Sequence, residues 1–215
     1  MIAYQALVDR VVACRACPRM EGRRRVLGEG NGPLRASALL VGLAPGRHGA
    51  DRTGIPFVGD RSGAVLDGLL QRCGLRREDV FVTNAVLCNP RDAEGRNAEP
   101  TAAELTSCRG HLAATLQLVE APLVVALGRT AFRAVLATAP ASLRFEDCLG
   151  MARRWTGGWL LAATYHPGPR VTNHPVRRRH LEEQWTALFG ATAPGRQADS
   201  AGAGVPAVVK LQTRA

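Results

Sequence analysis

The chain has 215 residues, with 28 Lys or Arg against 18 Asp or Glu, which gives a net charge of +10. This length allows one domain with a substantial core and is too short for two. No apolar run approaches the ~20 residues of a membrane-spanning helix, so we expect no membrane association. The N-terminus lacks the basic and apolar segments of a signal peptide, and we therefore expect a cytoplasmic protein.

Apolar runs and helical patterns alternate along the chain as in an α/β protein. In order, we expect a helix over residues 3–13, a strand over 38–41, a helix over 62–72, a strand over 80–83, a helix that begins at Thr101, a strand over 123–127, a helix over 130–137, a strand that ends at Tyr165 and a helix over 175–189. Ser62 is the expected N-cap of the second helix, and Thr101 with Glu104 has the form of a capping box. The strands are apolar throughout, which is typical of a parallel sheet covered on both faces.

The end of the chain has a different composition. Residues 191–215 mix Ala, Gly, Pro, Ser and Arg without helical or strand periodicity. We interpret this segment as a flexible tail behind a folded domain of residues 1–190.

Two short turns directly follow expected strands. Gly42-Leu43-Ala44-Pro45-Gly46 follows the first strand, and His166-Pro167-Gly168 follows the last. Ligand sites in open α/β sheets lie outside the carboxyl ends of the strands. A glycine-rich turn alone is weak support, because most such turns are tight loops. The pair of turns predicts one site built from both.

The six cysteines carry a second signal. Cys14 and Cys17 form a C-x-x-C motif, Cys88 follows the second strand, and Cys108 lies in the helix that begins at Thr101. In a cytosolic protein this spacing favours a metal over a disulfide, and thiolates suit either Zn²⁺ or an iron–sulfur cluster. The other two cysteines, Cys73 and Cys148, are expected to be small buried side chains.

Basic residues gather in local clusters, and the cluster after His166 contains Arg170 and the run Arg177-Arg178-Arg179. Arginine forks match phosphate oxygens, so this clustering favours a nucleic-acid partner. An Arg-rich genome would give the same composition without such a partner. Neighbours within the run point in different directions on a helix, so the three cannot all contact one strand of a nucleic acid.

The motifs together resemble those of the iron–sulfur uracil-DNA glycosylases. The resemblance covers roughly residues 10–190 and rests on the turn at 42–46, on His48-Gly49, on Arg52-Thr53-Gly54, on Phe57, on Gly59-Asp60-x-Ser62-Gly63, on Thr83-Asn84-Ala85-Val86-x-Cys88 and on Tyr165-His166-Pro167. Leu43 in the second position of the turn resembles the family 5 form, whereas the family 4 form has Glu there. The resemblance implies a three-layer α/β/α sandwich with a four-stranded parallel sheet. It also implies a 4Fe-4S cluster on Cys14, Cys17, Cys88 and Cys108.

The implied activity is removal of uracil, or of other deaminated bases, from DNA by hydrolysis of the N-glycosidic bond, with a monomer acting at the nucleoid. The base must first be flipped out of the duplex into a pocket. Phe57 would stack on it, and the Asn84 amide would bind its O4 and N3 edge. His166 would donate to O2 as negative charge develops there, together with backbone N–H groups around Gly42, Leu43 and Ala44.

Three roles have alternatives at this stage. Asp60 is the carboxylate that would support the sugar and orient water, or else it caps the helix that follows. His48 lines the pocket, or else it is a solvated loop residue. Arg170, Arg177 and Arg179 bind DNA phosphates or reach the minor groove, or else they form a solvated helix face.

Two departures from the family pattern matter. Gly168 stands where family 5 usually has Ser, which removes a side-chain contact beside the proposed catalytic His166. The loop over residues 91–99 contains no His, whereas a related subgroup uses a His in this loop to bond covalently to its product. We therefore expect no covalent capture. A different class, a non-catalytic metal-cluster module that binds nucleic acid, would use the same cysteines and basic surface without a base pocket.

Overall fold

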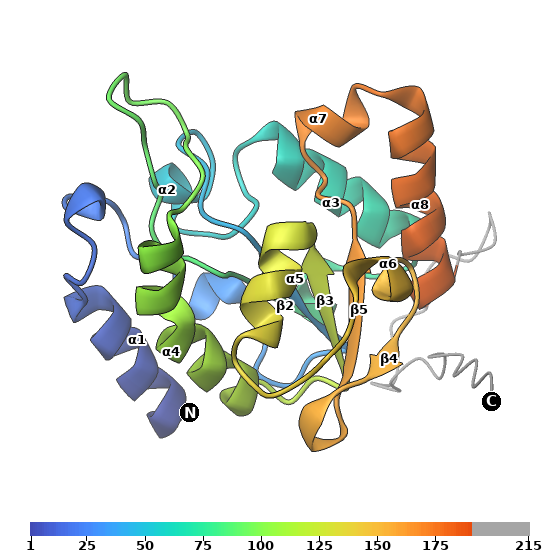
Figure 1. The fold of residues 1–215 in the computed structure, drawn as a ribbon, viewed down its shortest axis with the longest axis horizontal. Helices are drawn as coiled ribbons and strands as arrows, with labels where there is room; N and C mark the ends of the chain where they lie inside the picture. The colour runs from blue at the N-terminus through green and yellow to red at the C-terminus, as the bar shows by residue number, and fades with distance from the viewer. Residues whose placement is uncertain (191–215) are drawn as a thin grey trace.

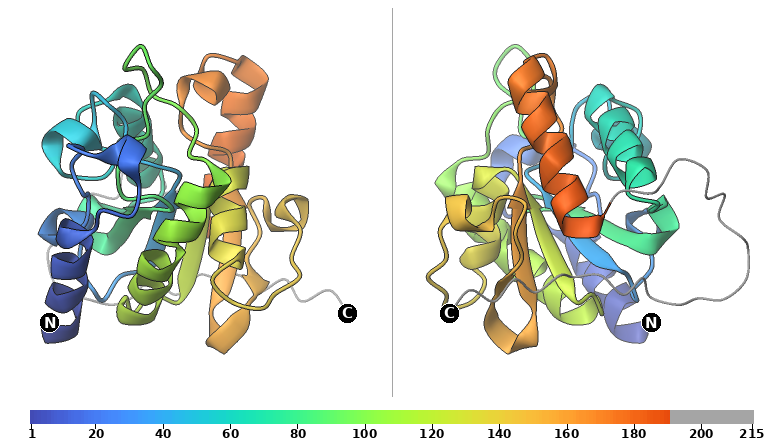
Figure 2. Two further views of the ribbon diagram at one scale, coloured as in Figure 1. Left: turned by 60° about the vertical axis from the view of Figure 1, so that its left-hand side comes forward. Right: turned by 90° about the vertical axis from the view of Figure 1, so that its right-hand side faces the viewer.

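The computed structural model describes residues 1–190, so the expected tail at 191–215 lies outside the described residues. A central sheet is covered by helices on both faces, which gives the expected three-layer sandwich (Figures 1 and 2). Among the described residues, no helix is long and apolar enough to cross a membrane.

The sheet has five strands in the order β2-β1-β3-β5-β4. They are β1 (Ala38–Gly42), β2 (Val80–Asn84), β3 (Leu123–Leu127), β4 (Arg153–Arg154) and β5 (Leu160–Thr164). Strands β2, β1, β3 and β5 run parallel, as the sequence predicts. The four expected parallel strands are present, and a fifth strand that was not expected, β4, pairs antiparallel with β5 at the edge of the sheet. This strand is two charged residues long and has no apolar pattern that could reveal it.

Alternate residues of the parallel strands enter one of two core layers. In β1, Leu39 and Val41 face one layer, and Ala38 and Leu40 face the other. The first layer is closed by α1 (Ile2–Ala13), α4 (Ala102–Leu118), α5 (Arg129–Leu136) and α6 (Phe145–Cys148), and the second by α3 (Arg61–Arg72) and α8 (Pro175–Phe189). Figure 2 shows the two groups of helices on opposite sides of the sheet. Burial of both faces explains why the four parallel strands are largely apolar.

The helix caps agree with the sequence at one helix and differ at another. Thr101 and Glu104 form the expected capping box at the start of α4. Ser62 is not the N-cap of α3, because the helix begins one residue earlier and Asp60 caps it, its Oδ1 accepting a hydrogen bond from the Gly63 N–H at 2.9 Å. The short helices α2 (Ala50–Thr53) and α7 (Pro169–Thr172) lie beyond the carboxyl ends of the parallel strands, where the functional site is expected (Figure 1).

Candidate nucleobase pocket and cysteine cluster

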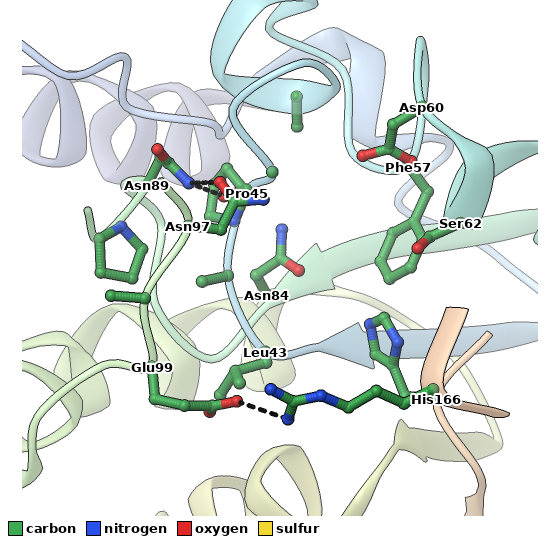
Figure 3. A pocket seen from close by; sticks show the side chains of 16 residues that line it. Leu43, Pro45, Phe57, Asp60, Ser62, Asn84, Asn89, Asn97, Glu99 and His166 are labelled. Carbon is green, nitrogen blue, oxygen red and sulfur yellow. Dashed lines mark hydrogen bonds and ion pairs between the residues drawn. The ribbon is translucent and has the colours of Figure 1, made fainter. Parts of the chain in front are cut away.

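Both expected turns contribute to one cavity at the carboxyl ends of the strands. It has a volume of about 290 Å³. The residues expected at the site that line it are Leu43, Ala44, Phe57, Asp60, Asn84, His166 and Arg170. Asn84 and His166 come from the ends of β2 and β5, and Phe57 comes from the loop between α2 and α3 (Figure 3). The structure thus brings the two distant turns together at one cavity.

Gly42, which the resemblance placed in contact with the base, is not among the residues that line the cavity, and it forms the floor beneath two of their side chains. A Cβ atom at this position would lie 2.4 Å from Asn84 Oδ1 and 2.7 Å from Phe57 Cε2. Atoms of the real side chains could not remain that close to it. The missing side chain at Gly42 is therefore what allows the Phe57 ring and the Asn84 amide to approach each other at the end of β1.

Asn84 is 1% exposed, and its Oδ1 has no hydrogen-bond partner within the described residues. A buried polar atom of this kind normally has a partner, and leaving it without one has a cost in free energy. The side chain faces the cavity between Leu43 and the Phe57 ring (Figure 3). An Asn side chain with a buried, unpartnered amide oxygen therefore forms part of the cavity wall.

His166 stands against the same aromatic ring. The ring centroids of Phe57 and His166 are 5.9 Å apart, with an angle of 39° between their planes. Burial lowers the pKa of His166, and the Asp60 carboxylate partly opposes this shift. A lowered pKa keeps the imidazole neutral at pH 7, with one ring nitrogen as a donor and the other as an acceptor.

Gly168, where the family pattern has Ser, lies close to the other side of the imidazole. A Cβ atom at Gly168 would be 2.7 Å from His166 Nδ1 and 3.6 Å from Ser62 Oγ. A side chain at this position would press on the His166 ring. The observed position of the ring therefore depends on a glycine at residue 168.

Asp60 has the capping role that the sequence left as one alternative, and it also lines the cavity. Its Oδ1 accepts the hydrogen bond from Gly63, whereas its Oδ2 faces the turn, since Cβ atoms at Gly46 and Gly49 would lie 2.8 and 2.2 Å from it. The two roles are compatible, because they use different oxygens.

His48 does not line the cavity, which was one of its two expected roles. Its side chain is exposed and is not among the residues that line the cavity, which agrees with the alternative of a solvated loop residue.

Several polar residues of the cavity were missed by the sequence analysis, and Asn89 is the best connected of them. Asn89 is 1% exposed, and its Nδ2 donates to the Pro45 carbonyl at 2.6 Å and to Asn97 Oδ1 at 2.9 Å. It follows Cys88 directly, and a polar side chain in the loop after β2 was the available signal. These bonds tie the turn at 42–46 to the loop over residues 89–99.

The proposed DNA-binding arginines lie at the mouth of the cavity and on the neighbouring helix. Arg170 of α7 lies 3.9 Å from Glu99 across the mouth (Figure 3). Arg177 leans back to donate to the Arg170 carbonyl at 3.4 Å, and Arg178 turns away to pair with Glu182. The side chains of Arg177 and Arg178 therefore have different partners, as their spacing predicts. A second cavity of about 540 Å³ adjoins the first and shares His166 and Arg170 with it.

Four cysteines surround a separate small cavity of about 20 Å³. They are Cys14, Cys17, Cys88 and Cys108, from three segments that are far apart in sequence. Burial raises the pKa of Cys88 to about 12 and that of Cys108 to about 11, and it also raises the pKa of Cys17. Arg25 closes one side by donating to the Cys14 carbonyl at 2.8 and 3.2 Å.

The remaining cysteines are elsewhere. Cys73 and Cys148 are buried in the two opposite core layers, as expected for small packing residues. All six thiols are free. In residues 1–190, no group of three or more His, Cys, Asp or Glu side chains is arranged to hold a single metal ion.

Known proteins similar to this chain are uracil-DNA glycosylases. The chain is 36% identical over 178 residues to the type-4 uracil-DNA glycosylase of Thermotoga maritima, covering 81% of this chain and 88% of the relative. It is 40% identical over 162 residues to the type-5 uracil-DNA glycosylase of Thermus thermophilus (62% and 72%), and 32% identical over 201 residues to the type-5 enzyme of Pyrobaculum aerophilum (79% and 84%). The family model of the uracil DNA glycosylase superfamily matches residues 29–189. The chain belongs to the uracil DNA glycosylase superfamily.

Proposed function

We propose that this protein is a DNA glycosylase that flips uracil out of DNA and hydrolyses its N-glycosidic bond, which starts base excision repair. The observation that carries the proposal is the buried, unpartnered Asn84 Oδ1 beside an aromatic ring. A flipped nucleobase has a flat face for the ring and a hydrogen-bonding edge for the amide.

The Asn84 amide accounts for the choice of uracil over cytosine. Its oxygen can accept from uracil N3–H while its nitrogen donates to O4. Cytosine has an unprotonated N3 and an amino group at C4. In the same orientation the amide oxygen would meet the N3 acceptor, and the amide nitrogen would meet the amino donor, so neither hydrogen bond could form. A site that leaves buried polar groups unpaired rejects the wrong ligand strongly.

His166 acts on the leaving base. As the glycosidic bond breaks, negative charge moves onto uracil and reaches O2. A neutral imidazole placed beside the Phe57 ring donates a hydrogen bond to that oxygen and stabilises the charge where it develops. Backbone N–H groups of the turn around Leu43 and Ala44 add donors to the same oxygen.

Asp60 supports the other half of the reaction. The sugar acquires positive charge as the base leaves, and the free Oδ2 of Asp60 stabilises that charge and orients the attacking water. Leu43 supplies no carboxylate, so the mechanism depends on stabilising the departing base and the sugar cation rather than on a strong general base. Water completes the reaction, and no protein–DNA bond forms.

The assignment within the superfamily follows from the same turn. The relatives carry both type-4 and type-5 names. Leu43 in the second position of the turn favours the type-5 form, and with it a base range that extends to other deaminated bases such as hypoxanthine. The site is complete within one chain, and we propose a monomer that works on DNA in the bacterial cytoplasm, at the nucleoid.

We also propose that Cys14, Cys17, Cys88 and Cys108 hold a 4Fe-4S cluster. Four free thiols line one cavity, and no carboxylate or imidazole side chain is among the other residues that line it, which matches the donor set of such a cluster. A cluster of this kind would offer each thiolate its own iron. The four sulfurs would therefore not need to lie within bonding distance of a single metal ion. When bound, the cluster crosslinks the three segments that carry its ligands.

The first prediction concerns the pocket, and labelled oligonucleotides carrying uracil, hypoxanthine or xanthine provide the assay. His166→Ala should lower the single-turnover excision rate by about 10²–10³, because it removes a preorganised donor to developing charge. Asn84→Ala should impair excision of uracil more than that of bases with a different edge. DNA affinity should change little in either variant.

His174→Ala is the matched control for this assay, since His174 lies at the N-cap of α8 and outside the cavity. A near-wild-type rate in His166→Ala would contradict the role given to His166. Absence of turnover by the wild-type protein on every substrate would favour the non-catalytic module instead.

The second prediction concerns the metal. Protein purified without oxygen should contain about four irons per chain. Replacing any one of Cys14, Cys17, Cys88 or Cys108 with Ala should abolish or destabilise the bound iron. Cys73→Ala and Cys148→Ala are the controls and should retain it, because both thiols lie in the core layers. Stoichiometric zinc without iron in the wild-type protein would refute the cluster.

The third prediction concerns DNA affinity. Each phosphate contact contributes about 0.7–0.9 to the slope of log K against log salt concentration. Arg170→Ala, or Arg177→Ala with Arg179→Ala, should therefore weaken binding and flatten this slope while the base preference is kept. Arg178→Ala is a matched control, because Arg178 is paired with Glu182. A slope that does not change in the test variants would assign these arginines to a solvated helix face.

A further inference from the structure

The backbone of Phe57 has an unusual conformation. Within residues 1–190, Phe57 is the one non-glycine residue with a positive φ, at 54°. L-residues with a side chain disfavour this left-handed region, and they adopt it where surrounding structure holds them there. The ring of this residue is the aromatic wall of the cavity, so whatever holds the backbone also sets the direction of the ring.

Arg77 contacts this segment from outside the cavity. Its two terminal guanidinium nitrogens donate to the carbonyls on either side of the Phe57 Cα, Nη1 to Pro56 O at 2.9 Å and Nη2 to Phe57 O. The remaining donor, Nε, binds Asp67 Oδ1 of α3 at 2.6 Å. All three guanidinium nitrogens are hydrogen-bonded, so the planar group holds two successive carbonyls in one orientation. A lysine has one ammonium group and could not reproduce this arrangement.

The rest of the surroundings leave the clamped segment little room to move. A Cβ atom at Gly63 would lie 2.1 Å from the Phe57 carbonyl oxygen, so the first turn of α3 presses on the same group. The ring itself is confined between the floor at Gly42 and the imidazole of His166. Arg77 is thus the side chain that ties the backbone of the wall to the body of α3.

We propose that Arg77 is a positioning residue for base recognition, which holds the Phe57 ring at the angle needed to stack on a flipped base. It does not line the cavity, and its hydrogen bonds to this segment are to backbone carbonyls. The inference rests on the proposed function, since the stacking partner is the base that the enzyme excises.

The test measures single-turnover excision, inhibition by free uracil and affinity for undamaged DNA. Arg77→Ala should lower the excision rate by about 10- to 100-fold, the range expected when a group near the reaction is misplaced by about 1 Å. The inhibition constant of free uracil should rise, while DNA affinity stays within about twofold, because no phosphate contact is lost. Arg77→Lys should recover little, because it keeps the charge without the fork. Arg76→Ala is the control, since Arg76 pairs with Glu78 and Asp79 away from the cavity.

A double-mutant comparison shows whether Arg77 acts through Phe57. In a Phe57→Ala background, Arg77→Ala should have almost no further effect on the excision rate, because there is no ring left to position. An equal loss in both backgrounds would overturn the inference, as would an unchanged rate or a loss confined to DNA affinity. If Arg77→Ala does not fold, Arg77→Lys carries the same comparison. The proposed function itself fails only if the wild-type protein does not excise uracil, so the two failures are distinguishable.

Discussion

The absence of a side chain at Gly42 is the constraint on which the site depends. Gly42 ends β1, which lies between β2 and β3 in the sheet. The Phe57 ring and the Asn84 amide both occupy space that a Cβ atom at this position would need. Backbone pairing continues past the strand, with the Ala85 N–H donating to Gly42 O at 2.9 Å. The backbone beneath the Phe57 ring and the Asn84 amide is therefore held by the sheet, and fixed placement is what electrostatic stabilisation of a leaving base requires.

The cavity and the cysteine cluster share one stretch of backbone. Cys88 belongs to the cluster, and its neighbour Asn89 holds the Pro45 carbonyl of the glycine-rich turn. Arg91 in turn donates to Asn89 Oδ1 at 2.7 Å and pairs with the buried Asp51 at 2.5 Å. A metal centre that fixes Cys88 would thus also fix one support of the base pocket, without taking part in the chemistry there.

Much of the fold and part of the site could be predicted from the sequence. Strand β3 and helix α8 have the expected bounds. Both have local signals in the sequence: β3 is an apolar run that ends before Gly128, and α8 is a helical pattern that starts at Pro175. The two turns could be assigned to one site, because parallel strands bring their carboxyl ends to the same edge of a sheet.

The rest depends on tertiary contacts that leave no local pattern. Phe57 has a left-handed backbone that its sequence does not indicate. Arg77, which binds the Phe57 carbonyl, is 20 positions away in sequence, and Asn89 is 44 positions from its partner Pro45. Asp60 rather than Ser62 caps α3, a choice between two good capping residues that propensity cannot make. His48 points to solvent although its motif position suggested the cavity.

Replacing Gly42 with Ala tests the account most directly. The added methyl group cannot fit while the Phe57 ring and the Asn84 amide keep their places, so Gly42→Ala should lower the single-turnover rate of uracil excision by about 10²-fold or more. The protein should still fold and bind undamaged DNA. Gly110→Ala is the matched control, since nothing lies within 4 Å of a Cβ atom there. A folded Gly42→Ala variant that excises uracil at the wild-type rate would contradict the account.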